Sequence, residues 1–337
     1  MISSNPRRLT APEVANKNDN TMKSLTKFLF AALVAALGVS SCQKAEQYSE
    51  PQGKCETVTI SLVSPDDAVT KTIGDGTKVK DVYYTAFVDG RPVHSLENKV
   101  QLVDGKAVLN LRLVRNVKYN LVFWAQAVPQ EGEVSPFDIS SFYNDATVKV
   151  DYKGLSNDDT RDAFCSKKDI LAQGPVNETV SLRRPFAQVN FGSSDYEMVK
   201  YLGLHTAMKS EAHIYGLPDV LNVLDGSVSV SGASVPVDAF FTMSAIPSGD
   251  DEYITVKGVD YGYVNMNYVL ASEVGETVSV KAKMESGQST WETDLIPNVP
   301  VRRNYKTNIV GDLFSEHAAL QIIVVPDFKT PDEVVEL

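Results

Sequence analysis

Histidine and cysteine are scarce in this chain, and the sequence patterns of common enzyme classes are missing. Among 337 residues there are four histidines and three cysteines. No Gly-x-Ser-x-Gly elbow, His-Glu-x-x-His helix, phosphate loop or dinucleotide fingerprint occurs. The histidines are too scattered to predict a metal cluster, and the aspartate pairs lack the alternating spacing of a calcium loop. We therefore expect a protein that is not an enzyme and that needs no cofactor or metal. The residues concerned are His94, His205, His213 and His317, and the pairs Asp66-Asp67, Asp158-Asp159 and Asp250-Asp251.

Positive charge is also in short supply. The sequence has 32 lysines and arginines against 43 aspartates and glutamates, which gives a formal net charge of -11. Displacing counterions from a phosphate backbone needs a basic surface. This balance argues against nucleic acid as a partner.

Long apolar runs are missing as well. The longest, residues 28–39, is too short for a membrane span, which needs about 20 apolar residues. It follows Lys23 and Lys27 and leads into Val39-Ser40-Ser41-Cys42, in the order typical of a cleaved signal. The pattern resembles a bacterial lipobox and predicts lipidation at Cys42, where two acyl chains would anchor the protein to a membrane.

The lipobox hypothesis divides the beginning of the chain. Residues 1–21 are polar and are expected not to be translated or not to be structured, with Met22 as the start. Residues 22–42 form the signal peptide, and residues 43–56 form a tether. An ordinary secretory signal is the alternative. A twin-arginine signal at Arg7-Arg8 is disfavoured because the apolar run begins too far behind the arginines.

Only Cys55 and Cys165 follow Cys42. They are an even pair in a chain expected to be exported, so a disulfide between them and two separate thiols both stay open. No histidine is close to either in the sequence. A catalytic thiol is therefore not supported.

The dominant period of the chain is two, which predicts an all-β protein. Short runs rich in Val, Tyr, Phe and Thr are divided by Gly, Asp, Asn and Pro. The pairs Asp89-Gly90, Asp104-Gly105 and Asp225-Gly226 predict tight turns. Two short helical segments are expected, at 157–166 and 193–201. The expected strands are 57–63, 82–88, 99–103, 107–113, 119–127, 147–152, 178–182, 186–191, 240–245, 253–256, 264–271, 277–284, 291–295, 304–310 and 319–328.

The length predicts two domains. Bulky residues become rare at 229–237, after the Asp225-Gly226 turn. We therefore expect one domain at residues 57–232 and a second at 233–337.

Three stretches of the sequence resemble those of a known family. They are Phe123-Trp124-Ala125-Gln126, the segment Ser181 to Gly192 that contains Arg184-Pro185-Phe186-Ala187-Gln188-Val189-Asn190, and Asn298 to Ile309. In this order, and behind the lipoprotein leader, they resemble the Bacteroidetes-type fimbrillins, or type V pilins. The resemblance covers nearly the whole chain after Cys42.

The resemblance implies two tandem transthyretin-like β-sandwich domains and a surface-exposed lipoprotein of the outer membrane. It also implies assembly into a fimbria after a trypsin-like protease removes the first strand, so that a C-terminal strand of a neighbouring subunit can fill the groove. The partners would be other pilin subunits, of the same or an accessory kind, and a host or bacterial surface receptor. The function would be adhesion.

This sequence contains the parts that such assembly requires. Residues 57–63 alternate, with Val58, Ile60 and Leu62 on one face. The polar linker behind them contains Lys71, the expected processing site, although processed family members usually have arginine there. An uncut loop is the alternative. The donor-strand candidate, apolar on both faces, would equally suit an inner strand of its own domain; it consists of Leu320, Ile322, Ile323, Val324 and Val325.

Two further groups of residues have functional alternatives. We expect Arg183, Arg184, Gln188 and Asn190 to satisfy strand edges and loops, and Arg302 and Arg303 to be solvated or paired, rather than to bind an anion. The alternative function is a monomeric surface lipoprotein that binds glycans or proteins. Its aromatic residues are expected to pack in the core instead; they are Trp124, Tyr261, Tyr263, Tyr268 and Trp291.

Overall fold

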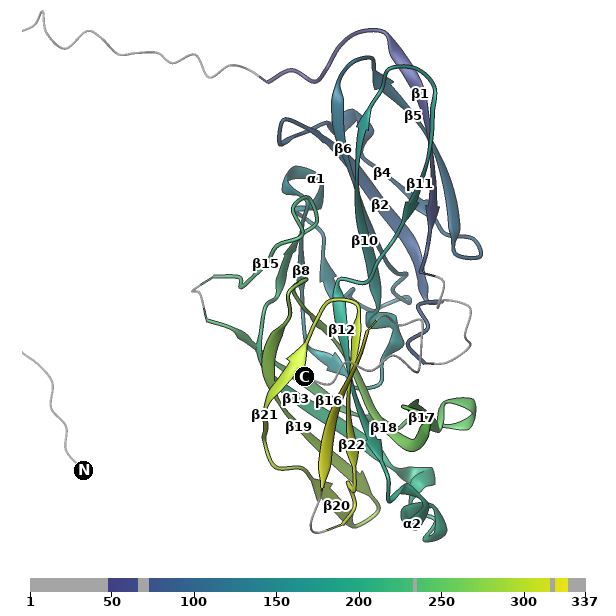
Figure 1. The fold of residues 1–337 in the computed structure, drawn as a ribbon, viewed down its shortest axis with the longest axis vertical. Coiled ribbons are helices and arrows are strands. Elements are labelled where there is room, and N and C mark those ends of the chain that lie inside the picture. Colours follow the sequence, from purple (N-terminus) through teal and green to yellow (C-terminus); the bar gives the residue numbers. More distant parts are fainter. Residues whose placement is uncertain (1–47, 66–72, 233–234, 316–318, 327–337) are drawn as a thin grey trace, which may run out of the picture. The chain divides into compact units, whose positions relative to one another are not determined.

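The computed structural model describes residues 48–65, 73–232, 235–315 and 319–326. The chain from Glu50 onward forms one compact unit. It is an all-β protein, as the period of two predicts (Figure 1). Within the described ranges the helices are α1 (Phe142–Asp145), α2 (Tyr196–Tyr201) and the 3-10 turns η2 (His94–Leu96), η3 (Asp159–Arg161), η4 (His205–Ala207) and η5 (Gly249–Asp251). None of the helices in this part is long and apolar enough to cross a membrane.

The first sandwich consists of two sheets. One is three-stranded, in the order β11 (Val176–Ser181), β1 (Cys55–Val63) and β5 (Lys106–Val114). The other has the order β10 (Ala163–Leu171), β6 (Lys118–Ala127), β2 (Val79–Val88) and β3 (Arg91–Pro92), with β4 (Asn98–Gln101) also paired to β2. Alternate residues of β1, β5 and β6 enclose a core between the two sheets.

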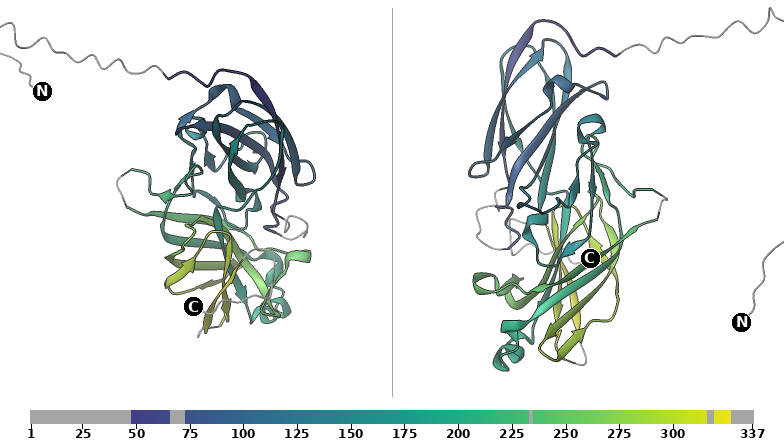
Figure 2. Two further views of the ribbon diagram at one scale, coloured as in Figure 1. Left: turned by 45° about the horizontal axis from the view of Figure 1, so that its top comes forward. Right: turned by 180° about the vertical axis from the view of Figure 1, so that it is seen from behind.

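The second sandwich also has two main sheets, with a third sheet beside them (Figures 1 and 2). Its five-stranded sheet has the order β17 (Tyr253–Val256), β18 (Val259–Leu270), β12 (Phe186–Ser193), β22 (Tyr305–Gly311) and β23 (Leu320–Pro326). The opposing sheet has the order β20 (Ser289–Glu292), β19 (Glu276–Ser286), β13 (Lys209–Leu217), β16 (Val237–Ala245) and β9 (Gly154–Leu155), with β21 (Ile296–Val301) on β19. The additional sheet has the order β15 (Val228–Ser229), β14 (Val220–Asn222), β8 (Thr147–Val150) and β7 (Phe137–Asp138).

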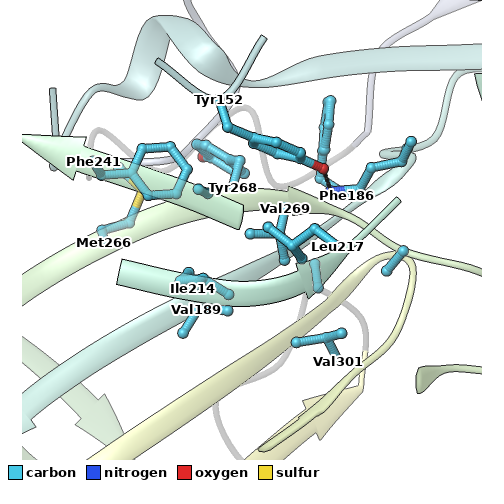
Figure 3. Packing of buried hydrophobic residues seen from close by; sticks show 14 of the residues in the cluster. Tyr152, Phe186, Val189, Ile214, Leu217, Phe241, Met266, Tyr268, Val269 and Val301 are labelled. Atoms are coloured by element: carbon cyan, nitrogen blue, oxygen red, sulfur yellow. Dashed lines mark hydrogen bonds between the residues drawn. The ribbon is translucent and has the colours of Figure 1, made fainter. Parts of the chain in front are cut away.

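The core of the second sandwich is rich in aromatic side chains. Figure 3 shows Tyr152, Phe186 and Tyr268 beside the aliphatic side chains of the cluster. The Tyr152 hydroxyl donates to the carbonyl of Pro218 at 2.6 Å and accepts from the amide of Leu270 at 3.0 Å. A buried phenol with both bonds satisfied adds apolar area without an unpaired polar group.

The order of the strands corrects the predicted domain boundary. Strands β12 to β14 precede residue 232, but they pair with β18, β22, β19, β16 and β8 and so belong to the second sandwich. The chain changes sandwich between Leu182 and Phe186, not at 232/233. The loss of bulky residues at 229–237 belongs to the loop between β15 and β16.

The chain also makes an excursion before it completes the first sandwich. Between β6 and β10 it contributes β7 and β8 to the additional sheet and β9 to the edge of the second sandwich. Phe142 and Val148 in this excursion are fully buried, in the same cluster as Trp124. The expected tight turns at Asp89-Gly90 and Asp104-Gly105 are present, and both residues of each pair have positive φ.

Candidate functional site

Strand β1 is held on both sides. Its nine residues pair antiparallel with β5, and residues 58–63 pair parallel with β11. Val58, Ile60 and Leu62 are each 0% exposed, on the face that the alternation predicts. If β1 left, it would open a slot that offers main-chain donors and acceptors on two sides and a row of three apolar holes. Figure 1 shows β1, in purple, between β11 and β5.

The residues directly after the linker are held by hydrogen bonds to residues outside β1. Lys71 lies outside the described residues, which resume at Ile73. The Ile73 amide donates to the Asp251 carboxylate at 2.7 Å, and the Arg184 guanidinium donates to the Gly74 carbonyl at 3.3 Å. Gly74 has φ +78, and a Cβ there would collide with the Gln188 side chain. The start of β2 is therefore held against the second sandwich.

Arg184, which holds the Gly74 carbonyl, is one partner of a buried ion pair. Its Nε donates to Asp162 Oδ2 at 2.8 Å, and both side chains are 0% exposed. The guanidinium also lies over the Phe164 ring, 5.1 Å from its centroid. Arg184 comes from the turn between the sandwiches and Asp162 from the residue before β10, so the pair joins three segments of the chain. The expectation that Arg184 forms hydrogen bonds with a loop is confirmed, because it donates to the Gly74 carbonyl.

The polar residues of the Ala187-Gln188-Val189-Asn190 stretch lie in the middle of a sheet, which corrects the expectation of an edge or loop. Strand β12 pairs with β18 on one side and β22 on the other, so Gln188 and Asn190 are central and buried. Asn190 donates to Asn308 Oδ1 at 2.8 Å and accepts from the Tyr263 hydroxyl at 2.8 Å. These bonds satisfy polar groups that would otherwise be costly to bury. They fix the register of three strands.

Strand β23, the donor candidate, forms the edge of its sheet. It pairs antiparallel with β22 over all seven residues and ends the order of strands. Ile323 and Val325 pack with Val256 and Val310, whereas Ile322 is 39% exposed. The strand is therefore neither an inner strand of its domain nor fully buried on both faces.

The aromatic residues considered for glycan stacking do not form a platform. Trp124, Tyr263 and Tyr268 are buried, as expected. Tyr261 and Trp291 are partly buried, and the Trp291 ring lies edge-on to Phe314 with centroids 5.1 Å apart. Arg302 stacks over Tyr305, while Arg303 is buried and donates to the carbonyls of Ala271 and Gly226. The structural roles expected for Arg302 and Arg303 are therefore confirmed.

A bridge between Cys55 and Cys165 is not formed, and both thiols are free. Cys55 is the first residue of β1. Cys165 lies near the other end of this strand, because it pairs with Arg183, and Ser181, two residues before Arg183, is the partner of Val63. The length of β1 alone separates the two positions by roughly 25 Å. A disulfide needs Cα atoms within about 7 Å. Cys42 lies outside the described residues.

Cys165 is expected to be a slow nucleophile, because burial raises the pKa of its thiol from 9.0 to about 11. At pH 8 the native protein should react with iodoacetamide at Cys165 roughly 100-fold more slowly than the urea-unfolded chain, since the thiolate is the reactive form. Peptide mapping by mass spectrometry would measure this, with Cys165→Ser to identify the labelled peptide. Equal rates in the two states would contradict the prediction.

In the described part of the chain, no group of three or more His, Cys, Asp and Glu residues could hold a metal ion. What the geometry offers is a first strand paired on both sides, an anchored segment after the linker and a terminal edge strand. The roles of Asp162 and Asp251, which hold that anchored segment, were not predicted from the sequence: Asp162 carries no pattern, and the pair Asp250-Asp251 was considered only as part of a calcium loop.

A family model described as a family of unknown function, DUF6562, matches residues 57–336. No curated protein matches the chain significantly in sequence. The chain is similar to a solved structure from Bacteroides eggerthii, provisionally assigned to cell adhesion, with 12% identity and TM-score 0.47, over 83% of this chain and 98% of the other. It is also similar to the tip fimbrial protein Mfa3 from Porphyromonas gingivalis, with 9% identity and TM-score 0.45, over 81% and 99% of the two chains. The fimbrial anchor protein Mfa2 from the same organism is similar with 11% identity and TM-score 0.38, over 80% of this chain and 96% of the other.

Proposed function

Since this chain belongs to DUF6562, a family of unknown function, we propose its role from its own residues: a fimbrillin-like subunit that assembles by strand exchange and serves adhesion. It would be anchored to the outer membrane through a lipid on Cys42, with its sandwiches outside the cell. The ordered motifs that resemble the fimbrillins support this proposal.

The observation that carries the proposal is that β1 is followed by a linker that contains Lys71, whereas the segment leading into β2 is held in place by residues outside β1. Strand β1 supplies three fully buried side chains and bonds to two neighbours, and the linker behind it contains Lys71. Beyond the linker, Arg184 and Asp251 hold residues 73 and 74 in place. Cleavage at Lys71 would therefore free β1 while leaving β2 and the slot in position. This is the arrangement that β-strand addition requires.

The terminal strand has the pattern to fill that slot. Leu320, Ile322 and Val324 repeat the spacing of Val58, Ile60 and Leu62, so they can enter the same three holes. Because β22 is the one strand that pairs with β23 in the described part of the chain, its release breaks a single ladder there. A strand that serves as donor must leave its own domain, and an edge strand does so at the lowest cost.

Limited trypsin digestion tests the proposal. We expect loss of the chain through Lys71 by mass spectrometry, followed by ladders of SDS-resistant oligomers. Deleting residues 320–337 should abolish the ladders but not the cleavage, because the slot would open without a donor to fill it. Lys71→Gln is the matched control and should leave the chain uncut at this site and monomeric.

A chain that stays uncut at Lys71, or that is cut but strictly monomeric, would contradict strand exchange. It would favour the alternative, a monomeric surface lipoprotein that binds glycans or proteins. Such a protein would bind its ligand without digestion.

A further inference from the structure

A cavity of about 400 Å³ lies where β10 and β11 meet the loops of the second sandwich. Its lining is unusually basic for a chain with net charge -11. Its basic lining residues are Lys167 and Lys168 of β10, Arg183 and Arg184 of the turn, and Arg303, and among the described residues of the lining Glu273 alone is acidic.

The basic side chains reach this cavity from different elements. Cys165 and Arg183 form an antiparallel bridge, with amide-to-carbonyl distances of 2.8 and 3.0 Å, so their side chains lie on the same face. Lys167 follows two residues along β10 and therefore shares that face. Arg303 lines the cavity from the loop after β21.

The positive charge of the cavity is only partly compensated. Arg184 is paired with Asp162, Lys168 with Glu178 at 2.7 Å, and Lys167 with the half-exposed Asp169 at 3.6 Å. Arg303 has Glu273 at 3.4 Å, but the Glu273 side chain is 72% exposed. Arg183 is exposed, and in the described part of the chain its side chain has no hydrogen bond or ion pair. A ligand with carboxylates could bind Arg183 without displacing any partner.

The cavity lies at one end of the β1 slot. Val63, the last residue of β1, pairs with Ser181, and its carbonyl accepts from the Leu182 amide at 2.8 Å. Ser181 and Arg183 both line the cavity. A chain that continues beyond the slot at this end therefore reaches the basic side chains within a few residues.

A donor strand that replaces β1 in the same direction brings an acidic segment to this end. With Leu320, Ile322 and Val324 in the holes of Val58, Ile60 and Leu62, Val325 takes the place of Val63. Asp327 then lies two residues beyond it. Residues 327–337 contain four carboxylates, Asp327, Asp332, Glu333 and Glu336, against the single Lys329. At about 3.3 Å per residue, Asp332 and Glu333 are within roughly 25 Å of the end of the slot.

We infer that this cavity binds the acidic segment 327–337 of a second copy of the chain and so holds the inserted donor strand in place. The inference rests on the proposed function, since the segment arrives with the donor strand. Arg183 is the residue expected to contribute most, with Lys167 beside it. The pairing also fixes the direction of insertion, because the reversed strand would carry its carboxylates away from the cavity.

Peptide binding to the trypsin-processed chain lacking residues 320–337 tests the inference. One peptide has the sequence 320–337, and the second has its four acidic residues replaced by Asn or Gln. We expect the neutral peptide to bind about tenfold more weakly at low salt, with the difference shrinking in 0.5 M salt. Arg183→Gln together with Lys167→Gln should weaken the acidic peptide similarly and the neutral peptide not at all. Lys209→Gln, at an exposed lysine outside the cavity, is the matched control.

The outcomes separate the two proposals. If both peptides bind equally well, the cavity inference is overturned and strand exchange stands. The cavity inference also fails if the charge effect persists in the Arg183→Gln/Lys167→Gln variant, since the carboxylates then bind elsewhere. If neither peptide binds the processed chain, strand exchange fails and the inference falls with it.

Discussion

Arg184→Met is expected to lower the free energy of unfolding by about 3–5 kcal/mol, since it leaves the Asp162 carboxylate buried without its cation. Both side chains are 0% exposed, so water cannot replace the lost partner. The variant also loses the bond to the Gly74 carbonyl, which helps to hold the segment after the linker. Urea denaturation followed by circular dichroism would measure the change.

Two variants serve as controls for this prediction. Arg183→Met, at the exposed neighbour, should change the free energy of unfolding by less than about 0.5 kcal/mol. The double variant Arg184→Met/Asp162→Leu should recover much of the loss, because replacing both charges by apolar groups removes the unpaired charge. A loss below about 1 kcal/mol for Arg184→Met alone would show that the pair does not anchor the segment after the linker.

Ile60→Ala is expected to destabilise the protein by about 2–5 kcal/mol, because the truncated side chain leaves a cavity in the middle of the first core. Ile60 is 0% exposed and lies between its neighbours in β5 and β11. The substitution should also weaken the retention of β1 after cleavage at Lys71. Thermal or urea unfolding measures the first effect, and the rate at which the cleaved N-terminal fragment dissociates measures the second.

Ser61→Ala is the matched substitution in the same strand, on the face away from the core. It should change the free energy of unfolding by less than about 0.5 kcal/mol. Equal effects of Ile60→Ala and Ser61→Ala would mean that β1 is not held by its buried face. That result would remove the physical basis for a slot with three apolar holes.

Strands whose apolar residues alternate were predictable from the sequence, and strands with small or charged residues were not. Strand β5 alternates between exposed and buried positions along its length, and its predicted bounds differ by one residue at each end. Strand β10 was missed because Cys-Ser-Lys-Lys-Asp occupies its middle, and its first residues were assigned to a helical segment. Strand β13 was missed because its buried face includes the small residues Ser210 and Ala212. Of the predicted helices, α2 is present, whereas the segment 157–166 consists of the turn η3 and the start of β10.

The parts of the candidate site also differ in whether they could be predicted from the sequence. The alternation of β1 and the apolar character of β23 could be recognised from local sequence. The anchor of the linker could not, because Asp162, Arg184 and Asp251 are far apart in the chain and meet only after both sandwiches have formed. The domain boundary was misplaced for a related reason: strand pairing, which sets it, joins β12 to β22 across more than a hundred residues.

The excursion of the chain through β7, β8 and β9 makes the two sandwiches inseparable in sequence. A fragment ending at Leu182 would contain every strand of the first sandwich, yet it would carry Phe142 and Val148 without the β14 and β16 partners of that region. During synthesis on the ribosome, these apolar residues stay uncovered until the segments that pack against them emerge much later. The gene for such a protein can therefore be neither shortened to one sandwich nor recombined at its midpoint without exposing an aggregation-prone surface.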